Sequence, residues 1–419
     1  MIKGRQTVYL MTETYPLAGP DDPFLHDEVR ALAEVFDLVL IPTTNTGGDC
    51  APLPANVETR LGLAATASSR RARARSLVRA TFSPLLYREI IGSCPASLRT
   101  RSLATILVRL SRSFRVEAWV RSQLIPGMEP GSSLMYSWWS FSAAYGAGRA
   151  LHGTGIPFLT RAHGYDLFAD QELIGFIPFQ RQLIEVLSFM ACDSHTGANY
   201  LRERYPDLAG KVTTSYLGTG DPGILAEAST DGVLRIVTCS SNTTVKRVDL
   251  LARGLSLMAS TSPDIEFHWT HIGVGPLASE LKSLVNTLPG LVGRCTITGY
   301  LTEPEWRQQF TGRPVDLFAN VSSSEGLPVS LMEAASFGIP MMATSVGGMP
   351  EIVSEVNGIL LEANPSPESI ATALEAFARL TPEERASKHA ASRATFERDF
   401  DAEVNYRRFV ALLESITAS

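Results

Sequence analysis

DLFANVSSSEGLPVSLMEAASFGIPMMATSVGGMPEIV, residues 316–353, is the stretch that decides the fold. An apolar run predicts a buried strand over residues 316–321, and helix-forming residues predict a helix over residues 329–336. A second apolar strand over residues 339–343 leads to a glycine pair and another short helix start. The order strand, turn, helix, strand, turn, helix is typical of a parallel α/β sheet.

Two carboxylates stand out in this stretch. Glu325 lies at the turn before the helix, and Glu333 follows two turns further on, at nearly the same face. Backbone N–H groups around Gly326, Leu327 and Pro328 are expected to point toward an anion at the helix start. A carboxylate beside a helix N-terminus, with a second one in reach, suits a ligand with both phosphate and hydroxyl groups, such as a sugar nucleotide.

Glu325 and Glu333 resemble the E-x7-E motif of retaining glycosyltransferases of the GT-B fold. The whole segment over residues 322–353 closely resembles glycosyltransferase family 4, the group that builds bacterial polysaccharides. A glutamate pair alone carries little weight, because a solvent-exposed pair on a helix arises by chance, whereas a long segment in the family's order is specific. The resemblance implies an α/β fold with two Rossmann-like doubly wound domains that face each other across a cleft, and a C-terminal helix that crosses back to the first domain.

The length of 419 residues exceeds one ordinary core, so two or three domains are expected. We expect an N-terminal, acceptor-side Rossmann-like domain over residues 1–220, with an Arg-rich helical insertion at about 68–125. A nucleotide-sugar-binding Rossmann-like domain is expected over residues 221–400. The last segment, residues 401–419, has apolar residues at helical spacing and is expected to pack on the first domain.

Composition predicts a cytoplasmic protein. The apolar fraction of 45% and the charged fraction of 19% are typical of soluble globular proteins. No apolar run reaches the roughly 18 residues that cross a bilayer, and the N-terminus lacks the pattern of a signal peptide. The five cysteines lie far apart without a C-x-x-C pair, which argues against a zinc site or a disulfide framework.

The net charge of −6 is unevenly spread. Twelve arginines and two acids between Arg70 and Arg121 give this region +10, so the remainder carries −16. Apolar residues are interleaved with these arginines at helical spacing. This pattern predicts that the protein binds an anionic membrane peripherally, on the inner face of the cell membrane. The alternative is ordinary helices with solvated arginines. Nucleic acid is disfavoured because no recognised motif is present and the overall charge is acidic.

A candidate sugar-binding segment follows the strand predicted at residues 156–160. Open α/β sheets place ligand groups at strand ends, where His163 can hydrogen-bond a sugar hydroxyl and Asp166 can accept a bond from one. The H-G-x-D pattern resembles the family segment whose histidine lines the donor sugar site from the N-terminal domain; a structural histidine is the alternative. The family's first loop, on the acceptor side, often carries two adjacent glycines, whereas this chain has Gly19 alone.

Aromatic residues cluster after the strand predicted at residues 133–138. Trp138, Trp139, Phe141 and Tyr145 can stack on a sugar face or pack the domain, and packing is favoured for most of them.

Two cations precede a predicted helix in the second half of the chain. Lys246 and Arg247, beside the N–H groups of a helix start, form a candidate diphosphate clamp. The family usually has an arginine five positions before the lysine. This chain has Ser241 there, so either Arg247 substitutes for that arginine or the phosphate is held less firmly. A solvated Lys-Arg pair is the alternative.

Two further segments are expected near the donor. Gly273, in the G-x-G turn after the strand predicted at residues 266–272, permits close approach of the backbone to a ligand or a helix. This signal is weak, and the resemblance supplies most of its meaning. Tyr300 and Leu301 end a segment that is expected to bring the backbone near the nucleotide base.

The resemblance implies a retaining transfer of a hexosyl group from a nucleotide-diphosphate sugar to a hydroxyl of a glycan or lipid-linked acceptor in bacterial surface polysaccharide synthesis. A uridine diphosphate (UDP) sugar is favoured by family frequency. Lys246 and Arg247 would hold the diphosphate, Glu325 the donor sugar and its developing positive charge, Glu333 the ribose, and His163 the sugar. No metal or other cofactor is expected, because cations and helix N-termini replace the metal and no Asp-x-Asp motif is suitably placed.

Two other functions stay open. Ser241 and the altered first loop allow a catalytically inactive sugar-nucleotide-binding protein, and a GT-B epimerase or phosphorylase would use a similar cleft. A nicotinamide-dependent oxidoreductase is disfavoured because no G-x-G-x-x-G follows the first strand.

Overall fold

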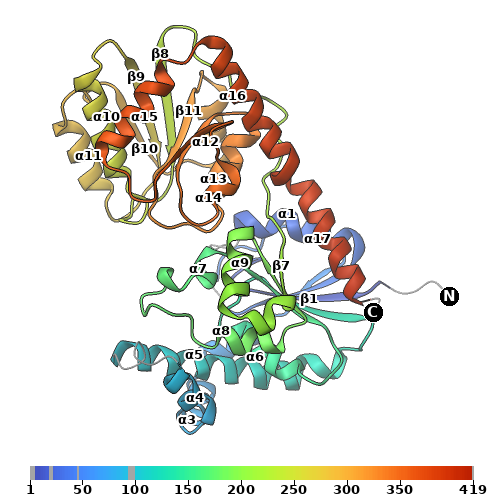
Figure 1. The fold of residues 1–419 in the computed structure, drawn as a ribbon. Helices are drawn as coiled ribbons and strands as arrows, with labels where there is room; N and C mark the ends of the chain where they lie inside the picture. The colour runs from blue at the N-terminus through green and yellow to red at the C-terminus, as the bar shows by residue number, and fades with distance from the viewer. Residues whose placement is uncertain (1–4, 18–21, 45–46, 93–99, 418–419) are drawn as a thin grey trace. The chain divides into compact units, whose positions relative to one another are not determined.

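The structure is a computed structural model in which the described residues are 5–17, 22–44, 47–92 and 100–417. Two compact units share the chain, namely Met1–Ser215 with Tyr406–Ser419, and Tyr216–Asn405. Each unit contains one parallel β-sheet with helices against it (Figure 1). Two Rossmann-like parallel sheets confirm the predicted fold class.

The sheet of the first unit has seven parallel strands in the order β3-β2-β1-β4-β5-β6-β7. Their bounds are β1 Thr7–Thr12, β2 Asp37–Pro42, β3 Val57–Thr59, β4 Ser133–Ser137, β5 Phe158–Ala162, β6 Phe189–Cys192 and β7 Val212–Thr214. Thr7 pairs with Asp37 on one side and with Ser133 on the other. The strand order therefore reverses between β1 and β4, which is the switch point where open α/β sheets bind ligands.

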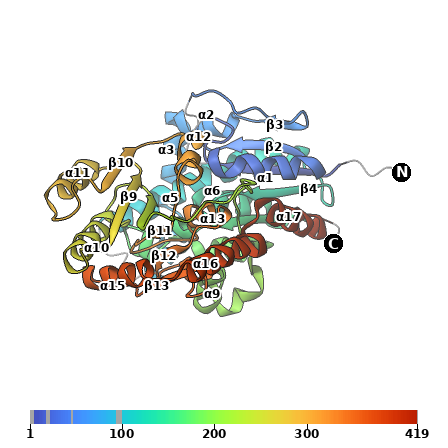
Figure 2. The same ribbon diagram turned by 90° about the horizontal axis from the view of Figure 1, so that it is seen from above.

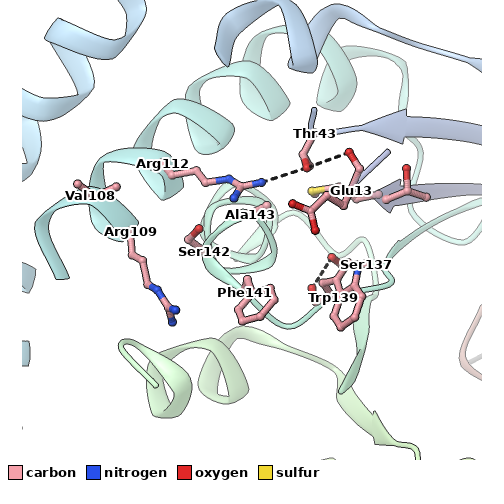
Figure 3. Close-up of a pocket in the computed structure, with 12 residues that line it drawn as sticks. Glu13, Thr43, Val108, Arg109, Arg112, Ser137, Trp139, Phe141, Ser142 and Ala143 are labelled. Atoms are coloured by element: carbon pink, nitrogen blue, oxygen red, sulfur yellow. Dashed lines mark hydrogen bonds between the residues drawn. The ribbon is translucent and has the colours of Figure 1, made fainter. Parts of the chain in front are cut away.

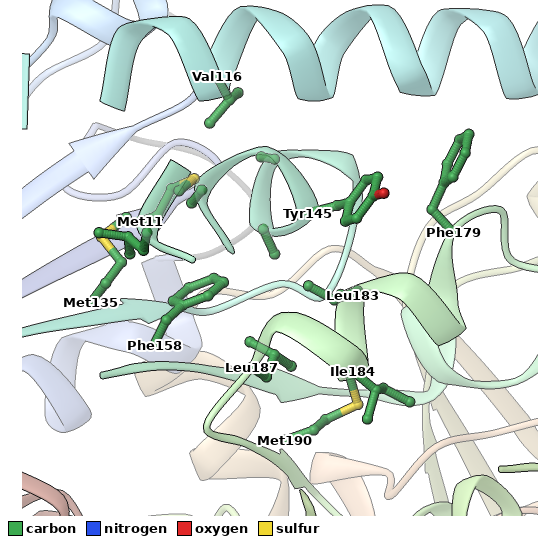
Figure 4. Packing of buried hydrophobic residues seen from close by; sticks show 14 of the residues in the cluster. Met11, Val116, Met135, Tyr145, Phe158, Phe179, Leu183, Ile184, Leu187 and Met190 are labelled. Atoms are coloured by element: carbon green, nitrogen blue, oxygen red, sulfur yellow. The ribbon is translucent and has the colours of Figure 1, made fainter. Parts of the chain in front are cut away.

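Helices fill both the ordinary crossovers and the Arg-rich region of the first unit. Their bounds are α1 Asp22–Val35, α2 Gly62–Ser68, α3 Arg70–Thr81, α4 Pro84–Gly92, α5 Thr100–Trp119, α6 Ser142–Leu151, α7 Gly164–Leu167, α8 Gln180–Val186 and α9 His195–Arg204. Helix α5 packs closely on α6, since a Cβ at Gly146 would lie 2.3 Å from the carbonyl oxygen of Ser113. Figure 4 shows Val116 of α5, Tyr145 of α6 and Phe158 of β5 in the same buried apolar cluster.

Polar contacts, in addition to apolar packing, connect the Arg-rich region to the rest of the first unit. Ser76 of α3 and Ser111 of α5 share a buried hydrogen bond of 2.9 Å. The buried carboxylate of Glu117 pairs with Arg79 at 3.1 Å and with Arg149 at 3.3 Å. These contacts join α3 to α5 and α6, so the exposed arginines of α3 lie on a helix that is fixed to the first unit.

The sheet of the second unit has six parallel strands in the order β10-β9-β8-β11-β12-β13. Their bounds are β8 Val233–Cys239, β9 Glu266–Ile272, β10 Cys295–Gly299, β11 Leu317–Asn320, β12 Met341–Thr344 and β13 Gly358–Leu361. The order reverses between β8 and β11, so this sheet has a switch point of its own.

Helices of the second unit cover both faces of its sheet. Their bounds are α10 Val248–Thr261, α11 Ala278–Thr287, α12 Glu303–Thr311, α13 Val329–Ser336, α14 Met349–Ile352, α15 Pro367–Ala378 and α16 Pro382–Thr395. Helices α10 and α15 pack together over one buried cluster, as Figure 2 shows, and α13 and α14 pack over another. The last helix, α17 Ala402–Thr417, begins in the second unit and belongs to the first from Tyr406 onward. No helix in the described part of the chain combines the length and the hydropathy that a membrane span requires.

A buried ion pair corrects one predicted strand. The strand predicted to end before Arg161 continues through it, as β5 extends to Ala162. Arg161 and Glu28 are both fully buried, and the Arg161 Nε donates to a Glu28 carboxylate oxygen at 3.0 Å. The Tyr136 hydroxyl donates to Glu28 at 2.6 Å, and the Arg161 guanidinium lies 4.0 Å from the ring centroid of Phe409 on α17. A charge can occupy a central strand here because its partner is buried with it.

The first prediction concerns this ion pair. Glu28→Gln removes the charge opposite Arg161, and we expect the first unit to lose about 3–5 kcal/mol of stability, because the buried guanidinium is left uncompensated. Urea titration followed by circular dichroism measures the loss. Glu34→Gln, at an exposed position of the same helix, is the matched control and should change stability by less than about 0.5 kcal/mol. Equal losses in the two variants would contradict the role assigned to the pair.

Candidate functional site

The predicted donor residues of the second unit converge at its switch point. Lys246 lies in the loop after β8 and Glu325 in the loop after β11, which are neighbouring strands. The Lys246 Nζ lies 2.5 Å from a Glu325 carboxylate oxygen. Their side chains are 25% and 10% exposed, so the pair is accessible to a ligand while it is shielded from most of the solvent. Two residues that are 79 positions apart thus form one charged centre.

Glu325 is held by polar side chains that the sequence analysis did not assign. The Ser322 hydroxyl donates to the same Glu325 oxygen at 2.7 Å, and the Asn320 amide donates to it at 3.3 Å. The Ser322 carbonyl in turn accepts a bond of 2.6 Å from the Thr344 hydroxyl of β12. Three consecutive serines, residues 322–324, directly follow the predicted strand, and this polar triplet is the sequence signal that could have identified Ser322. These bonds fix the direction of the carboxylate before any ligand enters.

The loop that carries Glu325 depends on a glycine pair. Gly347 has a φ of +52°, and a Cβ there would lie 1.9 Å from the carbonyl oxygen of Glu325. The Gly348 N–H donates to the carbonyl oxygen of Gly326 at 2.7 Å. Leu327 and Pro328 are buried, so they contribute to the site through the backbone and the start of α13. A side chain at position 347 would displace the loop.

Arg247 occupies a different position from the one expected of a diphosphate ligand. Its Nε donates to the carbonyl oxygen of Val321 at 2.7 Å, and its Nη2 donates to those of Ser322 and Ala363 at 2.7 and 2.9 Å. Its Nη1 donates to the side chain of Asn364 at 3.2 Å. The guanidinium therefore connects the loops after β11 and β13 through hydrogen bonds. Of the two cations, Lys246 is the one that contacts Glu325.

The other predicted donor residues lie along the same edge. Ser241 is exposed in the loop after β8. A Cβ at Gly273 would lie 1.9 Å from the Ser240 carbonyl oxygen, so the close approach made possible by this glycine is to the loop after β8. After β10, Tyr300 is 74% exposed, and Leu301 is half-buried against the apolar cluster under α13.

Glu333 lies on α13 in a largely desolvated position. Burial raises the pKa of Glu333 to about 7. Burial also raises the pKa of the Cys239 thiol to about 12, with a smaller contribution from the charge of Glu333. Glu333 therefore lies near enough to Cys239, the last residue of β8, to influence its thiol electrostatically. Near neutral pH its carboxyl can therefore either donate or accept a hydrogen bond.

His163 and Asp166 lie together at the carboxyl end of β5 in the first unit. Both ring nitrogens of His163 are buried and have no hydrogen-bond partner in the structure. The ring packs against Trp138 and Trp139, with centroid distances of 4.7 and 4.8 Å. Burial, and then the positive charge of Arg161, lower the pKa of His163 to about 3. The imidazole is therefore neutral at physiological pH, with one donor and one acceptor available for a ligand.

Asp166 supports this segment. Its two carboxylate oxygens accept the backbone N–H groups of Ser140 and His163, each at 2.6 Å. Burial raises the pKa of Asp166 to about 7, against the opposing effect of these bonds. The fully buried side chain holds His163 in place, and a direct bond to a sugar hydroxyl would require these contacts to change. Gly19, the other predicted acceptor-side residue, lies outside the described residues.

A pocket of about 230 Å³ lies at the switch point of the first sheet (Figure 3). Thr12 at the end of β1, Thr43 just after β2 and Ser137 at the end of β4 line its floor. The remaining polar and aromatic lining residues are Glu13, Arg109, Arg112, Trp139, Phe141 and Ser142. Of the aromatic cluster noted in the sequence, Trp138 and Tyr145 are buried packing residues, whereas Trp139 and Phe141 face this pocket. No group of three or more His, Cys, Asp or Glu side chains in the described ranges is arranged to hold a metal ion.

Comparison with known proteins supports the predicted resemblance. Residues 234–379 match the sequence family "Glycosyl transferases group 1". The chain is 29% identical over 157 residues to the "Putative colanic acid biosynthesis glycosyltransferase WcaL" of Escherichia coli (strain K12), which covers 36% of this chain and 38% of that protein. It is 30% identical over 159 residues to the amylovoran biosynthesis glycosyltransferase AmsK of Erwinia amylovora, which covers 36% of this chain and 37% of that protein. These matches thus span under two fifths of the length of each relative.

Solved structures match over nearly the whole chain. The lipopolysaccharide outer core galactosyltransferase WaaB, in its apo form, superposes with a TM-score of 0.68 at 13% identity, over 97% of this chain and 99% of that chain. Anabaena Alr3699/HepE in complex with UDP superposes with a TM-score of 0.63 at 14% identity, over 98% of this chain and 100% of that chain. These similarities establish the fold, and the family match lies within the second unit.

The second prediction concerns the pH dependence that Glu333 confers. The folded-state pKa of about 7 lies above the ordinary value of 4.5, so between these values the folded chain holds a proton that the unfolded chain has lost. Stability should therefore fall as the pH rises through this window. We expect Glu333→Gln to raise stability at pH 8 by on the order of 2 kcal/mol and to change it little at pH 4.

Thermal unfolding at pH 4 and pH 8 measures this difference. Glu355→Gln, at an exposed position of the same unit, is the control and should show no such pH dependence. A Glu333→Gln variant that is destabilised equally at both pH values would show that the carboxyl is not held in its protonated form.

Proposed function

We propose that this protein transfers a hexosyl group from a UDP-sugar to a hydroxyl of a glycan or lipid-linked acceptor in bacterial surface polysaccharide synthesis, with retention of anomeric configuration. The observation that carries the proposal is the Lys246–Glu325 pair, which lies at the switch point within the segment that matches the glycosyltransferase family. A cation beside a carboxylate suits a reaction that separates charge between a diphosphate and a sugar.

The two charges have complementary tasks in this reaction. When the bond between the sugar C1 and the phosphate oxygen breaks, the diphosphate gains negative charge, and Lys246 is placed to stabilise it. The sugar acquires oxocarbenium character, and the Glu325 carboxylate stabilises that positive charge while it binds sugar hydroxyls. A new bond then forms between C1 and the acceptor oxygen on the same face, and the leaving phosphate takes the acceptor proton.

Other residues position the substrates in this proposal. Arg247 keeps the loops after β11 and β13 together, so that Lys246 and Glu325 stay at hydrogen-bond distance. Glu333 binds the ribose hydroxyls of the donor. Neutral His163, with both ring nitrogens unpartnered, binds a sugar hydroxyl in the substrate complex.

The third prediction tests this assignment. Glu325→Ala should lower the transfer rate by about 100-fold or more while thermal stabilisation by UDP persists, because the carboxylate acts on the sugar. Lys246→Ala should weaken UDP binding by about 10-fold or more, because a charge-assisted contact to phosphate is lost. Transfer from a panel of nucleotide sugars, together with thermal stabilisation by the free nucleotides, measures both effects.

Lys282→Ala is the matched control, because Lys282 is an exposed lysine of the same unit. Near-normal transfer by Glu325→Ala would contradict its role. Binding of nucleotide sugars without transfer to any acceptor would favour an inactive binding protein, and product formed without an acceptor would favour an epimerase or phosphorylase.

We further propose that the first unit docks on an anionic membrane through α3 and α4. Three exposed apolar side chains lie on or between these two helices. Val78 of α3 is 60% exposed, Phe82 at the C-terminal cap of α3 is 78% exposed, and Ile91 of α4 is 77% exposed. Arg70, Arg71, Arg73 and Arg75 are exposed on α3. Apolar groups that enter the headgroup region, beside arginines that contact anionic lipids, are the two components of interfacial binding.

The fourth prediction tests the membrane surface. Arg71→Gln with Arg75→Gln should weaken binding to vesicles that contain phosphatidylglycerol by about 10-fold or more, since each basic residue near the surface contributes about 1 kcal/mol. Cosedimentation measures the bound fraction. The charge-matched double variant Arg253→Gln with Lys282→Gln, exposed on the second unit, should bind like the wild type. Absence of binding by the wild-type protein would end this proposal.

A further inference from the structure

The pocket at the switch point of the first sheet has a charge pattern that the proposed reaction does not require. Its cations, Arg109 and Arg112, come from α5, the helix that begins in the Arg-rich region, and not from the loops that follow the strands. Figure 3 shows both side chains extending from α5 toward the pocket, with Glu13, Trp139 and Phe141 around it. Residues from four separate parts of the chain thus meet around one cavity.

Arg112 is the cation that we assign to anion binding in this pocket. Its guanidinium donates to the Thr43 hydroxyl at 3.1 Å. Within the described ranges this neutral hydroxyl is the one hydrogen-bond acceptor of a group with five N–H donors. Burial lowers the pKa of Arg112, the charge of Glu13 opposes this shift, and Arg109 adds to it. A partly desolvated guanidinium beside another arginine is stabilised when an anion binds in front of it and accepts its hydrogen bonds.

Arg109 and the aromatic residues form the adjacent wall. Arg109 pairs with Glu172 and lies 5.5 Å from the ring centroid of Phe141. The rings of Trp139 and Phe141 are stacked, with centroids 5.9 Å apart and planes 22° apart. Aromatic faces of this kind accommodate the C–H face of a pyranose ring, while the polar groups around them orient it. The edge of Trp139 also contacts His163, so the pocket adjoins the candidate sugar-binding histidine.

We propose that this pocket binds an acidic saccharide, a sugar ring that carries a phosphate or a carboxylate, as the acceptor of the proposed transfer. Arg112 binds the anionic group, and Trp139 and Phe141 pack on the ring. Glu13 accepts a hydrogen bond from a ring hydroxyl and disfavours a second anion at that end, so the ligand enters in one orientation. This inference rests on the proposed function, and it specifies the chemical class of the acceptor.

Binding of small probes to the full-length protein tests the inference. The probes are α-D-glucose 1-phosphate, D-glucuronic acid, neutral methyl α-D-glucoside and inorganic phosphate, followed by saturation-transfer NMR or calorimetry. We expect either acidic sugar to bind at least about 10-fold more tightly than the neutral sugar, because a guanidinium–anion contact adds charge-assisted hydrogen bonds. The acidic sugars should also exceed inorganic phosphate, because only a sugar ring packs on the aromatic wall.

Three variants locate the bound probe. Arg112→Gln should lose at least about 10-fold in affinity for the acidic sugars, and Arg112→Lys should recover part of it. Arg30→Gln, an exposed charge change in the same unit, should bind like the wild type. Lys246→Ala should also keep its affinity for the acidic sugars, which separates this pocket from the donor site.

Several results would overturn the proposal. Equal binding of acidic and neutral sugars would exclude recognition of the anion, and equal binding of glucose 1-phosphate and inorganic phosphate would exclude a saccharide pocket. Unchanged binding in Arg112→Gln would place the probe elsewhere. If UDP still stabilises the protein and transfer occurs while acidic sugars fail to bind, the proposed function stands and this inference fails. If UDP does not stabilise the wild-type protein and acidic sugars do not bind it, the proposed function and this inference both fail.

Discussion

The buried ion pair between Glu28 and Arg161 is the contact on which the first unit depends. It links α1 to β5, the Tyr136 hydroxyl of β4 joins it, and Phe409 of α17 covers the guanidinium. Strand β5 can therefore carry a charge through the centre of the sheet and deliver His163 at its carboxyl end. The same positive charge helps to keep His163 neutral, so one interaction both builds the strand and sets the protonation state of the group at its end.

Parallel sheets impose the second constraint, because the carboxyl ends of their strands meet at one edge. In each unit the strand order reverses once, and each reversal is where the charged groups gather. Lys246 and Glu325 meet at the reversal in the second unit, and Glu13 and Arg112 line the pocket at the reversal in the first. The backbone departs from ordinary conformations only locally among the described site residues, at Arg247 with a φ of +48° and at glycines such as Gly347, so the fold itself supplies most of the positioning.

Local sequence patterns predicted the elements near the glycosyltransferase segment well, and α13 was predicted with its observed bounds. They failed where a tertiary contact reversed a local preference. Arg161 was predicted to follow the strand because its partner lies 133 positions away. The carbonyl acceptors of Arg247, which was predicted as part of a diphosphate clamp, belong to loops that are distant in sequence, so local patterns could not show these contacts. The pocket lined by Glu13 and Arg112 could not be read from spacing either, since its members share no local pattern and are joined only by the strand order.

The Lys246–Glu325 pair also explains how two charges can lie in a largely shielded position. A partly buried charge without a partner costs free energy, and here each side chain compensates the charge of the other. In the proposed reaction, a nucleotide sugar would offer a phosphate to Lys246 and hydroxyls to Glu325, so neither charge would be left uncompensated when the pair separates. A free nucleotide satisfies Lys246 alone and leaves Glu325 with Ser322 and Asn320. Under the proposed function, this pair would favour a complete donor over its nucleotide product, as turnover requires.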